Sequence, residues 1–402
     1  MTMTHEHPAG YNHTVLLSPD EQARRIGRVR SLMAADAAKP EAILVTDYAN
    51  LYYLTGRVFA GMLYLPAEGD PVYFVRRPVD LEGPGTVSIR KAEDMAKIIT
   101  DAPAQLGLEL DLVPYSTATR LAAIFPESTP VNASAILRGA RAVKTGAEIE
   151  MIRRSGVSHC RVYSRIPQLY EEGMTDIELQ VEIERASRLE GCLGDFRISG
   201  TSMEIYMGNL LAGENADAAG PYDFAMGGAG LDPSLPVGAD GTLIVPGTTV
   251  MVDMNGDYTG YMTDMTRVFS LGDPGELAAR AHECSREIHR ELQAMSRPGT
   301  PARGLYEKAQ EIVRSRGLEE YFMGHRQKAG FIGHGVGIEI NELPVIAPRS
   351  RDILEAGNVI ALEPKFVIPH VGAVGIENTY HVTPDGLENL TPAPEEIISL
   401  VK

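Results

Sequence analysis

The sequence contains little cysteine, no long apolar run and no excess of positive charge. Its three cysteines, Cys160, Cys192 and Cys284, have no paired spacing. The lack of paired spacing argues against a disulfide framework and against a cysteine-built zinc site, and it favours a reducing compartment, the cytoplasm. No apolar run approaches the roughly 20 residues that a membrane helix needs. The formal net charge of −17 disfavours nucleic acid as a partner. We therefore expect a globular protein that binds neither membranes nor nucleic acids.

The length of 402 residues exceeds that of one usual compact core, so two domains are expected. Residues 1–15 are predicted to form a mobile tail, because the start of the chain is polar and lacks the apolar segment of a signal peptide. Between residues 16 and 140, strand-like runs at 41–46 and 71–75 accompany a helical pattern at 20–33, which indicates an α/β domain.

Residues 141–402 are predicted to form a second, α+β domain. A helical pattern starts at Glu148, and a second helix opens with Thr175 and Glu178 at capping-box spacing and stops near Gly191. Helices around a mostly antiparallel sheet define an α+β domain. Further helices are expected at 276–295 and 302–316, and strands at 248–252, 267–270, 359–362 and 380–382.

Two aspartates lie in a segment that reads as a β-hairpin. Residues 252–267 have apolar flanks around a centre rich in glycine and asparagine, which places Asp253 and Asp264 on facing strands. Two facing carboxylates repel each other unless one takes a proton or a divalent ion lies between them. The hairpin therefore suggests a metal site.

Three more candidate ligands follow along the chain. His334 lies among glycines that let the backbone pass close to a site, and its imidazole can supply a nitrogen ligand. Glu363 and Glu377 are each embedded in an apolar strand, where an unpaired charge is costly. Both glutamates therefore need a partner.

The five residues occur within motifs that resemble, in order, those of the pita-bread (M24) superfamily, which includes aminopeptidase P, prolidase and creatinase. The family patterns are "D-x-G", "G-Y-x-x-D-x-T-R", "G-H-G-x-G", "E-P" and "G-x-E-x-T", and the first has an extra asparagine here. The matching segments are Asp253–Gly256, Gly260–Arg267, Gly333–Gly337, Glu363–Pro364 and Gly375–Thr379. Residues 47–56 resemble the "N-x-x-Y-L-T-G" segment of N-terminal domains in the same group.

The resemblance implies a pita-bread catalytic domain, a smaller creatinase-like N-terminal domain and a homodimer. It also implies two divalent ions, with manganese expected first and cobalt, zinc or iron also suited to the ligands. A hydroxide bridging the two ions would attack the substrate, and Glu363 would pass a proton to the leaving group. The implied ligands are Asp253, Asp264, His334, Glu363 and Glu377.

Neighbouring residues in the same motifs are candidates for supporting roles. Thr266 can hydrogen-bond a ligating carboxylate, and Arg267 and Asn378 can buttress the site. Lys365 directly follows Glu363-Pro364, so its ammonium either points into the site or extends outward to solvent.

Two histidines that peptidases of this group carry near the metals are missing. The position expected shortly after His334 is Asn341, which can donate a hydrogen bond but cannot exchange a proton near neutral pH. The upstream position falls in residues 212–223, where Tyr222 and Asp223 are the nearest capable groups. Asn341, Tyr222 and His325 are the predicted substrate-binding residues.

Three functions remain open from the sequence. The first is a metallohydrolase that cleaves X-Pro peptides or a related small amide. The second is a metal-assisted lyase or other non-peptidase enzyme on the same fold, which the missing histidines favour, since fold does not fix reaction. The third is a non-catalytic binding module, against which the complete ligand set argues.

Overall fold

The structure, a computed structural model, describes residues 12–200 and 204–401. The chain divides into two compact units between Arg141 and Ala142, one residue from the predicted boundary. Most of the predicted N-terminal tail, residues 1–11, lies outside the described residues. Asn12 and Thr14 already pair with the backbone of Glu82. Among the described residues, no helix has the length and hydropathy of a membrane span.

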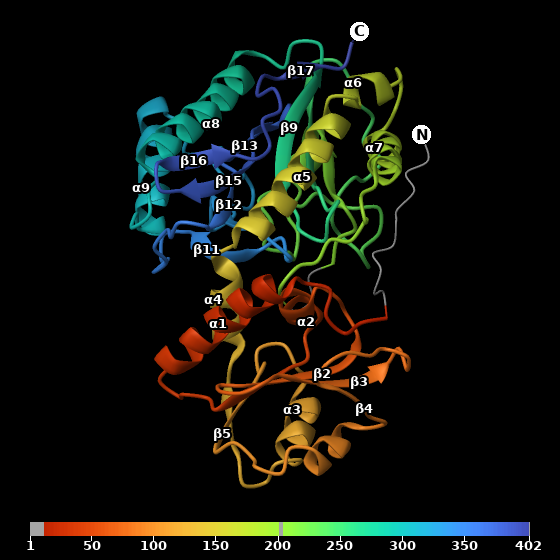
Figure 1. The fold of residues 1–402 in the computed structure, drawn as a ribbon. Coiled ribbons are helices and arrows are strands. Elements are labelled where there is room, and N and C mark those ends of the chain that lie inside the picture. The colour runs from red at the N-terminus through yellow and green to blue at the C-terminus, as the bar shows by residue number, and fades with distance from the viewer. Residues whose placement is uncertain (1–11, 201–203, 402) are drawn as a thin grey trace. The chain divides into compact units, whose positions relative to one another are not determined.

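The first unit is a six-stranded mixed sheet in the order β4-β3-β2-β1-β5-β6, with helices on both faces (Figure 1). The sequence predicted this α/β arrangement. Alternate residues of β1 face opposite sides, so Leu44 packs in the core shared with Phe125 near α3. The elements are α1 (Pro19–Ala35), β1 (Ala42–Val45), α2 (Tyr48–Thr55), β2 (Ala60–Pro66), β3 (Val72–Arg77), β4 (Thr86–Ser88), η1 (Ala92–Lys97), β5 (Gln105–Leu108), α3 (Tyr115–Ala122), β6 (Thr129–Asn132) and α4 (Ser134–Ala142).

The described residues of the second unit form three sheets that are antiparallel except at one edge. Their orders are β11-β10-β12-β15-β16, β17-β9-β8-β7 and β13-β14, and β17 pairs parallel to β9. The strands are β7 (Gly208–Ala212), β8 (Thr248–Asn255), β9 (Asp264–Leu271), β10 (Gly333–Gly335), β11 (Glu342–Ile346), β12 (Val359–Leu362), β13 (Lys365–Ile368), β14 (Gly372–Gly375), β15 (Asn378–Thr383), β16 (Gly386–Asn389) and β17 (Ile398–Ser399).

Helices cover these sheets on two sides. α8 and α9 lie against β13, β14, β16 and β11, while α7 packs on β7 and α5 packs on α7 (Figure 1). This α+β architecture agrees with the sequence-based prediction. The helical elements are α5 (Gly146–Tyr163), α6 (Ile166–Leu169), α7 (Asp176–Glu190), η2 (Gly213–Asp217), α8 (Glu276–Met295) and α9 (Ala302–Arg316).

Side-chain caps set the ends of the two helices beside β8. Thr175 and Glu178 form the predicted capping box of α7, and Gly191 ends that helix in the left-handed conformation. α5 begins at Gly146, two residues before the predicted start, because Thr145 and Glu148 form a second capping box. This signal was present in the sequence.

The predicted hairpin of residues 252–267 forms from β8 and β9. Asp253 pairs with Thr266, and Asn255 pairs with Asp264. The two aspartates are thus on facing strands but two residues apart in register. Since side chains alternate between faces along a strand, this offset keeps both carboxylates on the same face of the sheet.

Alanine substitution at the two glycines of α5 should have different effects on the free energy of unfolding. A Cβ at Gly156 would lie 2.1 Å from the backbone oxygen of Leu390, whereas one at Gly146 would meet nothing within 4 Å. We expect Gly156→Ala to lower the free energy of unfolding by about 1–3 kcal/mol, the usual cost of overpacking. Gly146→Ala, the matched control, should leave it unchanged or raise it. Equal effects in urea titrations would contradict this account of α5 packing.

Candidate metal centre

One pocket of the second unit, with a volume of about 260 Å³, is lined by all five predicted ligands. They come from the hairpin strands β8 and β9, from β10, and from the residues just after β12 and β14. The pocket also has an apolar wall that the sequence analysis did not identify. No sequence signal marked the wall, whose residues lie far apart along the chain: Phe196, Ile198, Ile205, Phe224, Phe331 and Ile340.

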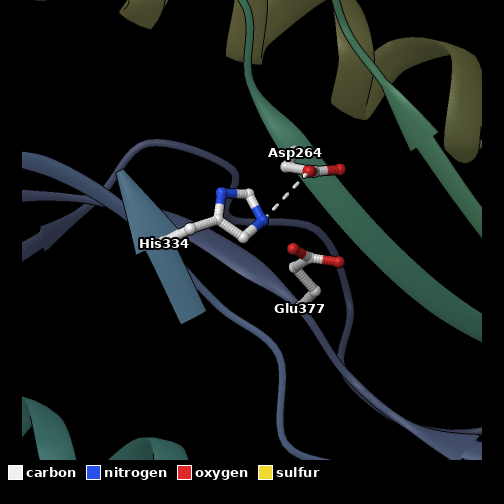
Figure 2. A group of neighbouring side chains, drawn as sticks. All are labelled: Asp264, His334 and Glu377. Atoms are coloured by element: carbon white, nitrogen blue, oxygen red, sulfur yellow. Dashed lines mark ion pairs between the residues drawn. The ribbon is translucent and has the colours of Figure 1, made fainter. Parts of the chain in front are cut away.

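Asp264, His334 and Glu377 form a group that can hold a cation. Their ligand atoms lie within 4.8 Å of one another, and Figure 2 shows the three side chains converging on one point. His334 Nε2 lies 3.8 Å from Asp264 Oδ2 and 3.3 Å from Glu363 Oε1. Glu377 Oε1 is buried with no hydrogen-bond partner. An orphaned carboxylate oxygen facing a second carboxylate and an imidazole fits a divalent cation.

The electrostatics of this group also call for a cation. Burial and the neighbouring carboxylates raise the pKa of Asp264 to about 8 and that of Glu377 well above its usual range. Burial lowers the pKa of His334, but the hydrogen bond and charge of Glu363 outweigh burial and raise it to about 9. In each case the negative charge of neighbouring carboxylates contributes to the shift, and a bound divalent cation would neutralise that charge.

The second group of candidate ligands, Asp253, Glu363 and Glu377, surrounds a lysine. The Nζ atom of Lys365 donates to Asp253 Oδ2 at 2.8 Å, to Glu363 Oε2 at 2.9 Å and to Glu377 Oε2 at 3.0 Å. Of the two orientations considered for Lys365, the structure has the inward one. Burial alone would lower its pKa, but the three carboxylates outweigh burial and hold the pKa well above the ordinary value.

The predicted supporting residues contact the ligands or the backbone that carries them. Thr266 donates to Glu377 Oε2 at 2.8 Å. Arg267 is fully buried, and its guanidinium donates to the backbone oxygen of Glu377 and to Asn378 Oδ1, both at 2.8 Å. The guanidinium also donates to the backbone oxygen of Thr266 and to backbone oxygens at 391–394. The guanidinium thus fixes the start of β15 against β9.

Asn341 lines the pocket, but its amide is already engaged. Its Nδ2 donates to the Ser199 oxygen at 2.8 Å, and its Oδ1 accepts from the Ser199 N–H at 2.7 Å. The neighbouring Ile340 N–H donates to the Arg197 oxygen. Asn341 therefore holds the segment that carries two apolar wall residues, Phe196 and Ile198.

Tyr222 and His325 are not among the residues that line the metal pocket. They line a separate, smaller pocket, and His325 Nδ1 lies 3.0 Å from Asp217 Oδ2. Asp223 borders both pockets. The structure thus brings the five predicted ligands and Asn341 together, whereas the substrate-binding role predicted for Tyr222 and His325 has no support from their positions.

Comparisons with known proteins identify both parts of the chain. The profile of Metallopeptidase family M24 matches residues 150–384, and that of the Creatinase/Prolidase N-terminal domain matches residues 25–143. The chain therefore belongs to metallopeptidase family M24, a family of hydrolases, and has a creatinase/prolidase N-terminal domain. The resemblance stated from the motifs is confirmed.

Individual relatives are distant but extend over most of the chain. A probable dipeptidase PepE of Mycobacterium tuberculosis is 26% identical over 92% of this chain and 96% of its own length. An Xaa-Pro dipeptidase of Pyrococcus furiosus is 25% identical over 89% of this chain and 95% of its own. The structure of an Xaa-Pro dipeptidase from Bacillus anthracis superimposes with a TM-score of 0.78 at 24% identity, covering 94% of this chain and 99% of that one. This last likeness shows the fold.

Removing the imidazole from the pocket should remove the metal. We expect His334→Ala, reloaded with Mn²⁺ and desalted, to retain at least tenfold less manganese than wild type, since second-shell losses alone cost 10–100-fold in affinity. His325→Ala is the matched control and should retain the wild-type content, because His325 does not line this pocket. Mass-spectrometric metal analysis measures both. Undiminished manganese in His334→Ala would refute the assignment.

Proposed function

We propose that the chain is a metal-dependent hydrolase that cleaves X-Pro peptides or a related small amide. The observation that carries this proposal is one pocket in which the complete set of family ligands faces an apolar wall. Carboxylates and the imidazole can hold a Lewis acid, and the apolar side chains can take a non-polar ring such as that of proline. Two relatives that bear the name Xaa-Pro dipeptidase support the same substrate class.

The metal and the residues around it have separable roles in this proposal. A divalent cation at Asp264, His334 and Glu377 would polarise the scissile carbonyl and acidify a water molecule. Manganese is the ion we propose first, with cobalt, zinc and iron suited to the same donors. Glu363 lies beside His334 at 3.3 Å and borders the pocket, so it is the residue we propose to carry the proton to the leaving nitrogen.

The groups that can exchange protons in this pocket are carboxyl groups and one imidazole. Of the described residues that line it, His334 is the one histidine, and both histidines that the family leads one to expect are replaced. This observation favours a second candidate, a metal-assisted lyase that breaks a small metabolite without incorporating water. Product analysis in ¹⁸O-labelled water separates the two, because a hydrolase places the label in the carboxylate product.

Two further parts of the proposal concern assembly and location. We propose a homodimer, as the family resemblance implies, which light scattering coupled to gel filtration would test. We also propose the cytoplasm, since Cys160, Cys192 and Cys284 are all free thiols.

The substrate class can be tested with paired dipeptides. Chelator-stripped protein, reloaded with Mn²⁺, Co²⁺ or Zn²⁺, is incubated with X-Pro dipeptides and the matching X-Ala dipeptides, and released amino acid is measured. We expect metal-dependent release with kcat/KM at least tenfold higher for X-Pro. His334→Ala serves as the inactive control. Protein that retains metal but releases nothing from any X-Pro peptide would overturn the proposal.

Asn341→Ala should weaken substrate binding more than the chemical step. It removes two hydrogen bonds to Ser199 that hold the apolar wall, each worth about 1 kcal/mol. We expect KM to rise roughly three- to thirty-fold, kcat to fall less, and metal content to stay constant.

Gln327→Ala is the matched control for this variant. Gln327 makes the same two-way amide contact, with the backbone of Gly220, outside the metal pocket. The Gln327→Ala variant should leave KM unchanged. A fall in kcat without a change in KM for Asn341→Ala would instead place Asn341 in the chemical step.

A further inference from the structure

We propose that the ammonium of Lys365 is a built-in second cation and that the chain therefore holds one divalent ion, beside His334, in place of the two that the sequence predicts. The inference concerns the composition of the centre and does not depend on the substrate proposed above.

The contacts of Lys365 leave no coordination position at its side of the centre. A lysine ammonium has three protons, and all three are donated, to Asp253, Glu363 and Glu377. A divalent ion there would need the same oxygens at about 2.0–2.2 Å. The ammonium nitrogen already lies 2.8–3.0 Å from each of them. The two cations cannot occupy this position together.

The fold supports the inward orientation of this lysine. Lys365 is the first residue of β13, its side chain is 0% exposed, and its backbone pairs with Gly375 of β14. At Gly375, whose φ is +123°, a Cβ would lie 2.9 Å from Lys365 Cα. The glycine therefore permits the close approach of β14 that encloses Lys365. A fully buried ammonium is retained only where carboxylates compensate it, and Lys365 has three carboxylates within 3.0 Å of its Nζ atom.

The two groups of candidate ligands, one around Lys365 and the other beside His334, differ in whether their oxygens already accept hydrogen bonds. Glu377 shows the difference within one side chain: Oε2 accepts from Lys365 and Thr266, whereas Oε1 is buried without a partner. Glu377 also offers a ligand atom within 4.8 Å of those of Asp264 and His334, so its unpartnered oxygen can join them around a metal ion. The carboxylates around Lys365 are thus neutralised without a metal ion, whereas the group beside His334 still has an oxygen without a partner.

The net charge of the centre is small when it holds one lysine ammonium and one divalent ion. Four carboxylates, Asp253, Asp264, Glu363 and Glu377, carry four negative charges, while one ammonium and one divalent ion supply three positive charges. A second divalent ion added to the lysine would reverse the sign, with two more positive charges in a buried site. The two sums are equal in size and opposite in sign, so the count of charges is compatible with a single ion beside the lysine, and the contacts of Lys365 argue against the second ion.

The direct test is the metal content of the wild-type chain. Protein stripped with chelator is reloaded with excess Mn²⁺ alone, desalted and analysed for metal, and its electron paramagnetic resonance spectrum is recorded. We expect one Mn²⁺ per chain with the spectrum of an isolated ion. Two ions per chain with the spectrum of an exchange-coupled pair, or no retained ion at all, would overturn the proposal.

Variants then assign the second position to the lysine. Lys365→Ala, which vacates the space among the three carboxylates, should retain two ions per chain, and Lys365→Ala combined with Asp253→Asn should return to one. Asp253→Asn alone should keep the single ion, because Asp253 serves the ammonium. Loss of that ion from a folded Asp253→Asn protein would contradict the assignment even if Lys365→Ala did not fold. Lys328→Ala, at an exposed lysine, is the control and should retain one ion.

Discussion

The constraint on which the second unit depends is the enclosure of four carboxylates in one small pocket. Asp253, Asp264, Glu363 and Glu377 line a space of about 260 Å³. Ionised together without cations, they would repel one another strongly, because charges in a dry interior are poorly screened. The ammonium of Lys365 neutralises part of this negative charge, and a bound metal ion neutralises most of the rest. β8, β9 and the residues just after β12 and β14 carry these four groups into the pocket.

The surrounding structure holds the ligands through their backbones as well as their side chains. Arg267 donates to the Glu377 oxygen, and Thr379 Oγ1 both accepts from the Asp264 N–H and donates to the Asp264 oxygen at 2.8 Å. These contacts join β9 to the start of β15, so the ligand oxygens stay in place before any cation arrives. Asn341 holds the apolar wall through its two hydrogen bonds to the backbone of Ser199. Hydrogen bonds thus hold the polar side of the pocket, and the Asn341 amide together with the Ile340 N–H holds the segment that carries Phe196 and Ile198.

Sequence patterns predicted the ligands and many helix ends because both depend on local signals. The five motifs carry their flanking residues with them, and the capping residues of α7 lie three positions apart. Long-range contacts carried no such signal: Asn341 meets Ser199 across 142 residues, and His325 meets Asp217 across 108. Lys365 lies between these two cases, because its motif was visible in the sequence but the direction of its side chain was not. Residues two apart in one strand share a face. Pro364 lies between β12 and β13, however, and these strands belong to different sheets, so the alternation of side chains did not predict where Lys365 points.

The central claim is that a lysine and one metal ion together neutralise this centre. Crystals of the Mn²⁺-loaded protein, measured at a wavelength where manganese scatters anomalously, test it most directly. The account predicts one anomalous peak per chain, among Asp264, His334 and Glu377, with the Lys365 ammonium still bonded to Asp253 and Glu363. Two peaks of comparable height within the pocket, with Lys365 displaced from the carboxylates, would contradict it.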